Sequence, residues 1–305
     1  MSDDTFDPAR RFGGMARLYG AAGLTRFAQA HVLVVGIGGV GSWVAEALAR
    51  SGIGRLTLID LDHVAESNTN RQIHALDGNF GKAKVSAMAE RITAINPACQ
   101  VRLIDDFVTP DNVAELLIGR YDFVIDCIDQ VRAKVALLVY CRQQGIAVVT
   151  SGSAGGKIDA SQIRLDDLSK TIQDPLLAKV RQRLRKEYGY ARDGKKMGVM
   201  AVYSSEPVKY PEICVVDEAV VTVANLVDDM AGQSTGNLVV SPPTAPASAG
   251  TTPDPSAGLN CAGFGSAMHV TATFGLFAVS YCLQSLAAPA KKQSHEKVAV
   301  SVSAT

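Results

Sequence analysis

The stretch VLVVGIGGVGS, from Val32 to Ser42, places a run of aliphatic residues directly before four closely spaced glycines, Gly36, Gly38, Gly39 and Gly41. The run predicts a buried strand. A Gly-x-Gly-x-x-Gly loop that opens the next helix predicts a nucleotide site, because glycines let a phosphate or ribose approach the backbone. The alternative is that the glycines only allow the strand and the helix to pack closely.

A carboxylate follows at the spacing that a ribose site requires. The strand RLTLID ends at Asp60, nineteen residues after Gly41, where a carboxylate can accept hydrogen bonds from ribose hydroxyls. These features together favour a nucleotide over packing alone, and they leave NAD and ATP both open.

The surrounding pattern predicts an α/β fold. Between His31 and Ser151, short apolar runs alternate with amphipathic stretches, which is typical of β-α repeats in a mainly parallel sheet. We expect a doubly wound, Rossmann-like sheet with a C-terminal antiparallel extension. The expected strands are 31–36, 55–61, 100–105, 121–127 and 146–151, and the expected helices are 39–51, 81–95, 110–119 (starting at Pro110) and 130–144 (ended by Gly145).

Composition limits the classes of protein to which this chain can belong. The 305 residues are 47% hydrophobic, and 30 acidic side chains balance 30 basic ones, so only a local basic patch could indicate a polyanionic partner. Six scattered cysteines form no Cys-x-x-Cys pair, and the polar N-terminus resembles no secretory signal. We therefore expect a cytoplasmic protein without structural zinc.

One apolar segment complicates this interpretation. The segment 261–283 carries no Asp, Glu, Lys or Arg over a length that could span a bilayer. It also holds His269, several hydroxyl residues and three glycines, and it has no basic residue beyond it until Lys291, which favours a buried or dimer-interface helix over a membrane helix.

Charged residues after Asp60 decide between the two nucleotides. A dehydrogenase has no evident need for this many donors, whereas Arg and Lys suit the extra phosphates of a triphosphate. The polar residues gathered around Asp62 are Asn68, Arg71, Gln72, Lys82 and Lys84. They predict an ATP site.

The strand 121–127 runs into the sequence IDCIDQ, which places two carboxylates at the carboxyl edge of the sheet. Mg²⁺ favours one or two carboxylates together with phosphate oxygens, so Asp129 is the candidate metal ligand. For Asp126 a capping or packing role is at least as well supported.

These motifs, in this order, resemble those of the adenylating superfamily that includes ubiquitin-activating enzymes and the adenylyltransferases of molybdopterin and thiamine biosynthesis. The matching strings are GxGGxGS, LIDLD, NxxRQ, GKAKV and DCIDQ. The resemblance implies that Arg71 and Lys84 touch the phosphates of ATP, that Asp129 binds Mg²⁺ and that Asp60 contacts the ribose.

The same resemblance implies a homodimer in which Arg17 of RFGGMARLYG enters the neighbouring site. Alternatively, Arg11, Arg17 and Arg26 only solvate an N-terminal helix.

Further strings resemble the branch of that superfamily that dehydrates threonylcarbamoyladenosine in tRNA, among them NTNRQIHAL, SGSAGGKID, KTIQDPLLAKVR and GFGSAMHVTATFG. This resemblance implies an ATP-dependent ligase or dehydratase that cyclises the modified base next to the anticodon. It also implies contact with cysteine-desulfurase sulfur-acceptor proteins.

A tRNA substrate requires positive surface for its phosphates. One short stretch is strongly basic, and a solvated helix face is the alternative to a tRNA-binding face. Its residues are Lys179, Arg181, Arg183, Arg185 and Lys186, with Lys195 and Lys196 beyond. No feature points to DNA.

Adenylation makes a carboxylate reactive by supplying AMP as the leaving group, so ring closure within the substrate needs no enzyme nucleophile. Cys127 and Cys141 fall on an expected strand and helix and are expected in the core, whereas Cys214 and Cys261 stay open as functional thiols. The rival functions are an adenylyltransferase for a ubiquitin-like or sulfur-carrier protein ending in Gly-Gly, a non-catalytic nucleotide-binding scaffold and, last, an NAD-dependent dehydrogenase.

The expected organisation follows from these assignments. Within the tRNA region we expect a helix that begins at Asp174 and Pro175 and ends before Gly189, and a strand pair around 197–209. The expected segments are an N-terminal helical dimerisation segment 1–30, an ATP-binding core 31–156, a tRNA region 157–228, a disordered insertion 229–258, a C-terminal apolar helix 259–288 and a disordered tail 289–305.

Overall fold

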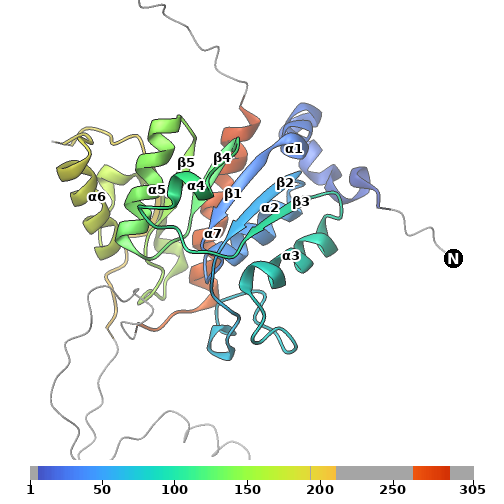
Figure 1. The fold of residues 1–305 in the computed structure, drawn as a ribbon, viewed down its shortest axis with the longest axis horizontal. Coiled ribbons are helices and arrows are strands. Elements are labelled where there is room, and N and C mark those ends of the chain that lie inside the picture. Colours follow the sequence, from blue (N-terminus) through green and yellow to red (C-terminus); the bar gives the residue numbers. More distant parts are fainter. Residues whose placement is uncertain (1–5, 193, 211–263, 289–305) are drawn as a thin grey trace, which may run out of the picture.

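The computed structural model describes residues 6–192, 194–210 and 264–288 (Figure 1). Its centre is a seven-stranded sheet in the order β3-β2-β1-β4-β5-β7-β6, in which every neighbouring pair is parallel except β6 and β7. The strands are β1 His31–Val35, β2 Arg55–Ile59, β3 Gln100–Ile104, β4 Phe123–Asp126, β5 Val148–Ser151, β6 Ile163–Asp167 and β7 Met200–Ser204. The expected doubly wound α/β fold is confirmed.

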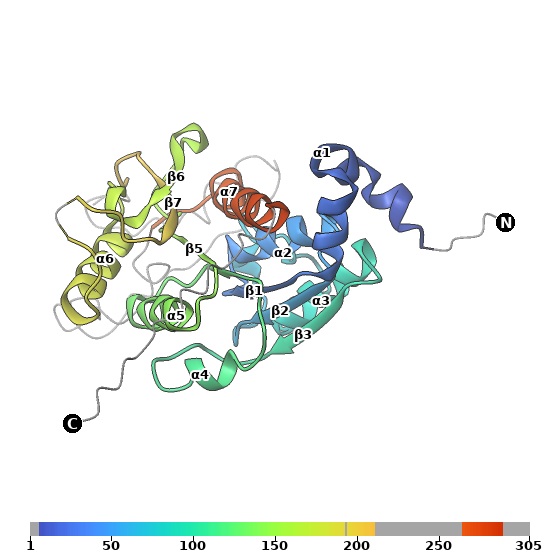
Figure 2. The same ribbon diagram turned by 90° about the horizontal axis from the view of Figure 1, so that it is seen from above.

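Helices cover both faces of the sheet (Figure 2). The helices α1, α2 and α7 lie on one face, and α4 and α5 lie on the other, while α3 packs on α2 and α6 packs on α5. The bounds are α1 Pro8–Gln29, α2 Gly41–Arg50, α3 Lys84–Ile95, α4 Val113–Leu116, α5 Val131–Gln144, α6 Pro175–Glu187 and α7 Met268–Ala287.

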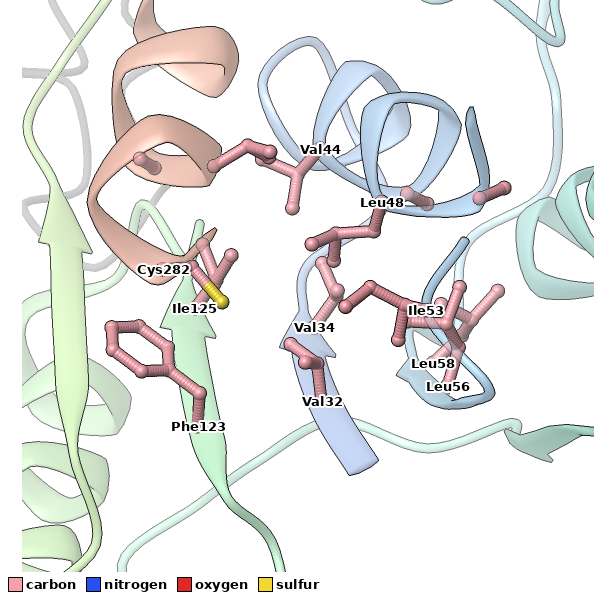
Figure 3. Close-up of a cluster of buried hydrophobic side chains, with 14 of the residues drawn as sticks. Val32, Val34, Val44, Leu48, Ile53, Leu56, Leu58, Phe123, Ile125 and Cys282 are labelled. Carbon is pink, nitrogen blue, oxygen red and sulfur yellow. The ribbon is translucent and has the colours of Figure 1, made fainter. Parts of the chain in front are cut away.

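The main core fills the space between the sheet and the helices α2 and α7. Figure 3 shows Val32 and Val34 of β1 facing Leu48 of α2, with Cys282 of α7 above Ile125 of β4. The central strands β1, β2 and β4 are buried almost end to end, as expected for parallel strands covered on both faces.

Most expected elements are present with shorter bounds. The largest error is the helix expected over 110–119. One capped turn does begin at Pro110, because Thr109 and Asn112 exchange hydrogen bonds (Thr109 N to Asn112 Oδ1, 2.7 Å) and Val113 N donates to the Thr109 carbonyl at 3.1 Å. The regular helix, however, is only the short α4. The expected helix start at 81 was also too early, because Gly81 has a φ of 83° and Ala83 pairs with His63 in an isolated bridge.

The strand pair expected around 197–209 is a single strand, β7. It pairs in parallel with β5 and antiparallel with β6, so the antiparallel extension comes from the earlier segment Ile163–Asp167. The helix ends were predicted better: Asp174 caps α6 by accepting from Leu177 N, and Gly145 ends α5 with a φ of 66°. The expected insertion 229–258, the tail 289–305, Cys214 and Cys261 lie outside the described residues.

Helix α7 lies within the fold. Among the described residues it is the one helix long and apolar enough to cross a membrane by length and composition, yet 50% of its most apolar window is buried. It packs on α1, α2, β4 and β5, and Val270, Phe274 and Cys282 are fully buried. These contacts favour the predicted buried helix over a membrane helix.

Removal of one buried ring from α7 tests this placement. Replacing Phe274 with Ala should lower the free energy of unfolding by about 3–5 kcal/mol, because the cavity left in a packed core cannot fully collapse. The same change at Phe80, a loop residue that is 39% exposed, should cost less than about 1 kcal/mol. Urea denaturation of both variants measures the difference, and equal losses would contradict a core position for α7.

A buried histidine predicts loss of stability in acid. His74 is only 1% exposed, and neither ring nitrogen has a hydrogen-bond partner among the described residues. Burial, together with the positive charges of Lys84 and Arg91, lowers the pKa of His74 to about 4. The unfolded chain takes up this proton near pH 6.5, so stability should fall by about 3 kcal/mol as pH drops from about 6.5 to about 4.

Urea denaturation across this pH range checks the prediction. His74→Leu removes the titrating group, so its stability should fall less steeply below about pH 6.5 than that of the parent chain. Parallel pH profiles for the two proteins would show that His74 does not contribute.

Candidate functional site

A cavity of about 340 Å³ opens at the carboxyl edge of the sheet. It lies between β1 and β4, where the strand order reverses, which is where ligands of open α/β sheets bind. The lining includes every predicted cofactor-binding and metal-binding residue except Gly41: Gly36, Gly38, Gly39, Asp60, Asp62, Asn68, Arg71, Gln72, Lys84 and Asp129.

The four glycines of the loop have different physical roles. Gly36 has a φ of 86°, and a Cβ there would lie 2.9 Å from the Cys127 carbonyl oxygen. Gly41 lies outside the cavity, and a Cβ on it would come within 1.7 Å of the Gly36 carbonyl oxygen, so it is required for the tight turn into α2. Gly38 and Gly39 face the cavity, and Gly39 leaves room for the Arg71 side chain.

Asp60 holds the glycine loop to the end of β2. Its two carboxylate oxygens accept hydrogen bonds from Ile37 N at 2.5 Å and from Asp62 N at 2.8 Å. Burial raises the pKa of Asp60, and Lys84 and these two N–H groups oppose that shift. Because a carboxylate has about four acceptor positions, both oxygens can still accept from a ribose.

Lys84 is a buried cation at the start of α3. Its ammonium donates to Asp62 at 2.7 Å, and its side chain is 7% exposed while that of Asp62 is 55% exposed. This ion pair fixes the ammonium at the cavity wall, where a phosphate can approach it from the other side.

Arg71 lies over Gly39 in the turn after Asn68. Its guanidinium donates to the Ser67 carbonyl at 2.7 Å and to Asn70 Oδ1 at 2.9 Å. Its own carbonyl accepts from Trp43 Nε1 at 3.0 Å, which ties the turn to α2. Sequence reasoning missed Trp43, because no local pattern indicates a contact 28 residues away.

Two amides of the same turn differ in their remaining hydrogen-bonding capacity. Asn68 accepts from Ala65 N at 3.0 Å and so shapes the turn that carries Arg71. Gln72 is 5% exposed, and its Oε1 has no partner among the described residues. Gln72 lines the cavity as a residue, but this oxygen is itself buried.

Asp129 has the properties expected of a magnesium-binding carboxylate. It is half-buried in the cavity lining, and within the described part of the chain its carboxylate has no hydrogen-bond or ion-pair partner. Asp62, the other candidate carboxylate, is engaged by Lys84. One free carboxylate beside a phosphate site matches the preference of Mg²⁺ for a few protein oxygens plus phosphate oxygens.

Asp126 has the predicted packing role, in a buried ion pair. Its carboxylate lies 2.9 Å from Lys134 Nζ, and neither side chain is exposed. Lys134 also donates to Thr150 Oγ1 at 3.0 Å and to the Ser151 carbonyl at 2.9 Å, and Asp126 accepts from Ile128 N at 3.0 Å. The network joins the ends of β4 and β5. Sequence reasoning missed Lys134.

A second wall of the cavity, Gly152–Gly155, was also missed. It directly follows β5, so the rule that ligands lie beyond the carboxyl ends of strands could have found it. Ser266, just before α7, and Thr271, in its first turn, also line the cavity. Both belong to the string GFGSAMHVTATFG, but no site role was predicted for either.

None of the described thiols is suited to act as a nucleophile. Cys141 is fully buried as expected, and burial raises its pKa to about 12. Cys127 is half-buried rather than in the core, because it lies just beyond β4 in the cavity lining. Burial and the Asp126 charge raise its pKa far above the ordinary range.

The predicted Arg17 and the basic residues lie away from this cavity. Arg17 is exposed on α1 and has no hydrogen-bond partner in the described ranges, whereas Arg11 donates to the Ile95 carbonyl and Arg26 to the Ala287 carbonyl. Arg11 and Arg26 thus bind backbone carbonyls of other elements, and both alternatives stay open for Arg17.

The basic residues of α6 differ in availability. Arg181 is bound to the Leu168 carbonyl and to Thr171, so its assignment as a tRNA contact conflicts with a cap-like role in the fold. Arg183 pairs with Glu187 at 2.9 Å, and Arg185 donates to the Ala191 carbonyl. Lys179 and Lys186 are exposed.

Comparison with known proteins agrees with this geometry. The chain is 51% identical over 286 residues to tRNA threonylcarbamoyladenosine dehydratase of Escherichia coli (93% of this chain, 96% of that protein) and 47% identical over 279 residues to that of Haemophilus influenzae (91% and 93%). The crystal structure of the E. coli tRNA N6-threonylcarbamoyladenosine dehydratase in complex with ATP superposes with a TM-score of 0.73 at 48% identity, covering 91% of this chain and 94% of that one. The ThiF family model matches residues 13–301, and the chain belongs to the ThiF family.

Proposed function

We propose that this chain catalyses the ATP-dependent dehydration of threonylcarbamoyladenosine in tRNA, next to the anticodon, through adenylation of the carboxylate of the modified base. One observation carries the proposal. A single cavity gathers Asp60, Arg71, Lys84 and Asp129 in a chain that is 51% identical to a protein named for this activity.

The chemistry needs activation because an unactivated carboxylate would have to expel oxide. A carboxylate oxygen attacks the α-phosphorus of ATP, an O–P bond forms, and the bond from that phosphorus to the bridging oxygen breaks, releasing pyrophosphate. An atom of the ureido group then attacks the acyl carbon and loses a proton as AMP leaves. Both reacting groups belong to one molecule, so the second step benefits from proximity.

Different cavity residues have different roles in these two steps. Arg71 and Lys84 neutralise charge that develops on the phosphate oxygens, and Asp60 orients the ribose. Asp129 holds Mg²⁺, which when bound supplies further positive charge to the phosphates. Lys84 is already positioned by Asp62, so its ammonium needs little reorganisation on binding.

Direct closure is supported by the state of the thiols. Transfer of the acyl group to an enzyme cysteine would need an accessible thiolate, and burial raises the pKa of Cys127 and Cys141. Among the described residues no thiol is available to compete with it, so the ureido group itself is the nucleophile in this proposal; Cys214 and Cys261 lie outside those residues.

A homodimer would complete the site. Arg17 is exposed and points to no acceptor among the described residues, and Leu18 beside it is 74% exposed. On α7, which packs on α1, Leu276 is 51% and Phe277 is 37% exposed. A second copy would cover these apolar side chains and bring Arg17 toward the neighbouring cavity. A cytoplasmic location stays a prediction from the cysteine pattern and the polar N-terminus, and contact with sulfur-acceptor proteins stays a prediction of the resemblance.

The decisive experiment incubates the protein with ATP, Mg²⁺ and tRNA carrying threonylcarbamoyladenosine, then digests the tRNA for mass spectrometry. We expect loss of water from the modified nucleoside and equimolar AMP and pyrophosphate. Asp129→Asn should slow turnover at least about a hundredfold, because one preorganised electrostatic contact is lost. No change in nucleoside mass with the folded parent protein would overturn the proposal.

A basic face on α6 would bind the tRNA. The helix begins beside the cavity, where Asp174 contacts Ser153, and it carries the exposed Lys179 and Lys186 away from there. Lys195 and Lys196 are exposed in the loop that follows. A phosphate backbone that crosses this face would lead the modified base toward the cavity.

Charge reversal tests the basic face. The double variant Lys179→Glu with Lys186→Glu should raise the KM for tRNA at least about tenfold and flatten its salt dependence, with ATP affinity unchanged. The control makes the same charge change at Arg55 and Arg102, which are exposed on β2 and β3 across the sheet, and it should leave the KM for tRNA unaltered. Equal effects of both doubles would contradict a specific face on α6.

A further inference from the structure

The wall Gly152–Gly155 is held by a buried carboxylate. Asp174, 5% exposed, accepts from Leu177 N at the start of α6 and from Ser153 N in the wall, each at 2.9 Å. A Cβ on Gly152 would lie 2.0 Å from Asp174 Oδ2, so the carboxylate fits only against a glycine. The wall and α6 are therefore joined at one side chain.

Two more buried charges fix the chain that continues from the wall. Lys157 is 3% exposed and donates to the carbonyls of Gln173, at 3.0 Å, and of Glu206. Glu206 is 4% exposed and accepts from Ile158 N and Asp159 N, both at 2.9 Å. Burying a charged group costs free energy unless the group is hydrogen-bonded. Several such groups in one place therefore indicate a segment whose backbone conformation is tightly fixed.

The residue before Asp174 supports the same conclusion. Gln173 has a φ of 54°, the one positive value at a non-glycine residue in the described part of the chain. Such a conformation is uncommon and persists only where neighbours enforce it. Here Lys157 holds the Gln173 carbonyl, so Asp174 is presented to Ser153 by a constrained backbone.

The wall holds backbone donors that no described acceptor uses. Ala154 and Gly155 line it, and in the described ranges neither N–H has an acceptor, although Ala154 is 8% exposed. The positive end of α6 lies behind them. Lys84 and Asp129 line the same cavity, so this wall and the residues proposed to bind the phosphates face one space.

We propose that Asp174 is a positioning residue that holds the N–H groups of Ala154 and Gly155 as donors to the acyl oxygen of the substrate. That oxygen is first part of the threonyl carboxylate and then the carbonyl of the acyl adenylate, where negative charge develops as the ureido group attacks. The inference rests on the proposed function and adds to it a subsite for the acyl group, separate from the residues that bind ATP.

Asp174→Asn tests the positioning role. Asn caps a helix about as well as Asp, so α6 should keep its bond to Leu177 N while Ser153 N faces an amide NH₂. We expect ATP affinity and the KM for tRNA within about twofold of the parent, and kcat for pyrophosphate release with modified tRNA at least about tenfold lower.

A matched control is Asp167→Asn. Asp167 is 3% exposed, caps a short helix through Ser169 N and accepts from Met197 N and Gly198 N, but it lies outside the cavity lining. Its kcat should equal that of the parent. A D174N protein with parent kcat, or one that loses ATP binding and turnover together, would overturn the positioning role.

The donor itself is tested at Gly155. Gly155→Pro removes the N–H, whereas Gly155→Ala keeps it and adds a Cβ that meets nothing closer than 3.4 Å. With ATP binding as the measure of folding, G155P should lose kcat as D174N does and G155A should not. Equal rates for the two variants would overturn the donor assignment while leaving the proposed function intact. If the parent protein itself forms no dehydrated nucleoside, the proposed function fails, and the inference fails with it.

Discussion

The buried ion pair of Asp126 and Lys134 is the constraint on which both walls of the site depend. Neither side chain reaches solvent, so each charge is compensated only by the other and by the hydroxyl, carbonyl and N–H groups around them. Removal of one partner from such a pair leaves an unpaired buried charge and costs about 3–5 kcal/mol. Because Lys134 binds Thr150 and Ser151 while Asp126 binds Ile128 N, the turn that carries Asp129 and the wall after β5 both begin at this pair.

On the nucleotide side of the cavity, the shape of the glycine loop depends on the absence of side chains as well as on charged groups. No Cβ fits between Gly41 and the Gly36 carbonyl, so the loop can turn into α2 only at a glycine, and Asp60 then secures it through Ile37 N. The acidic groups are separated by role. Asp62 positions Lys84, whereas the Asp129 carboxylate has no hydrogen-bond or ion-pair partner among the described residues. A buried cation and an unpaired carboxylate can therefore lie in one cavity without neutralising each other.

How far sequence could predict the site depended on the range of each interaction. Parallel strands buried on both faces leave continuous aliphatic runs, so their positions were predictable, and residues such as Arg71 and Asp129 follow strands whose carboxyl ends share one edge. Lys134 was not predictable, because a lysine on an amphipathic helix gives no sign that it points into the core. The structural role of Arg181 was not predictable for the same reason: its partners Leu168 and Thr171 precede the helix, and only the folded turn brings their oxygens to it.

The contribution of α7 lay beyond any local pattern. Asn70, beside Arg71, donates to the Ser266 carbonyl at 2.8 Å across 196 residues of sequence, and Gly156 donates to the Gly265 carbonyl at 2.8 Å. His269 meets the Ile158 carbonyl at 2.8 Å. The segment that leads into α7 thus touches both the turn that carries Arg71 and the chain that continues from the wall Gly152–Gly155. Two sides of the cavity that come from distant parts of the sequence are therefore held together by this C-terminal segment, and their separation is fixed by contacts that no local pattern predicts.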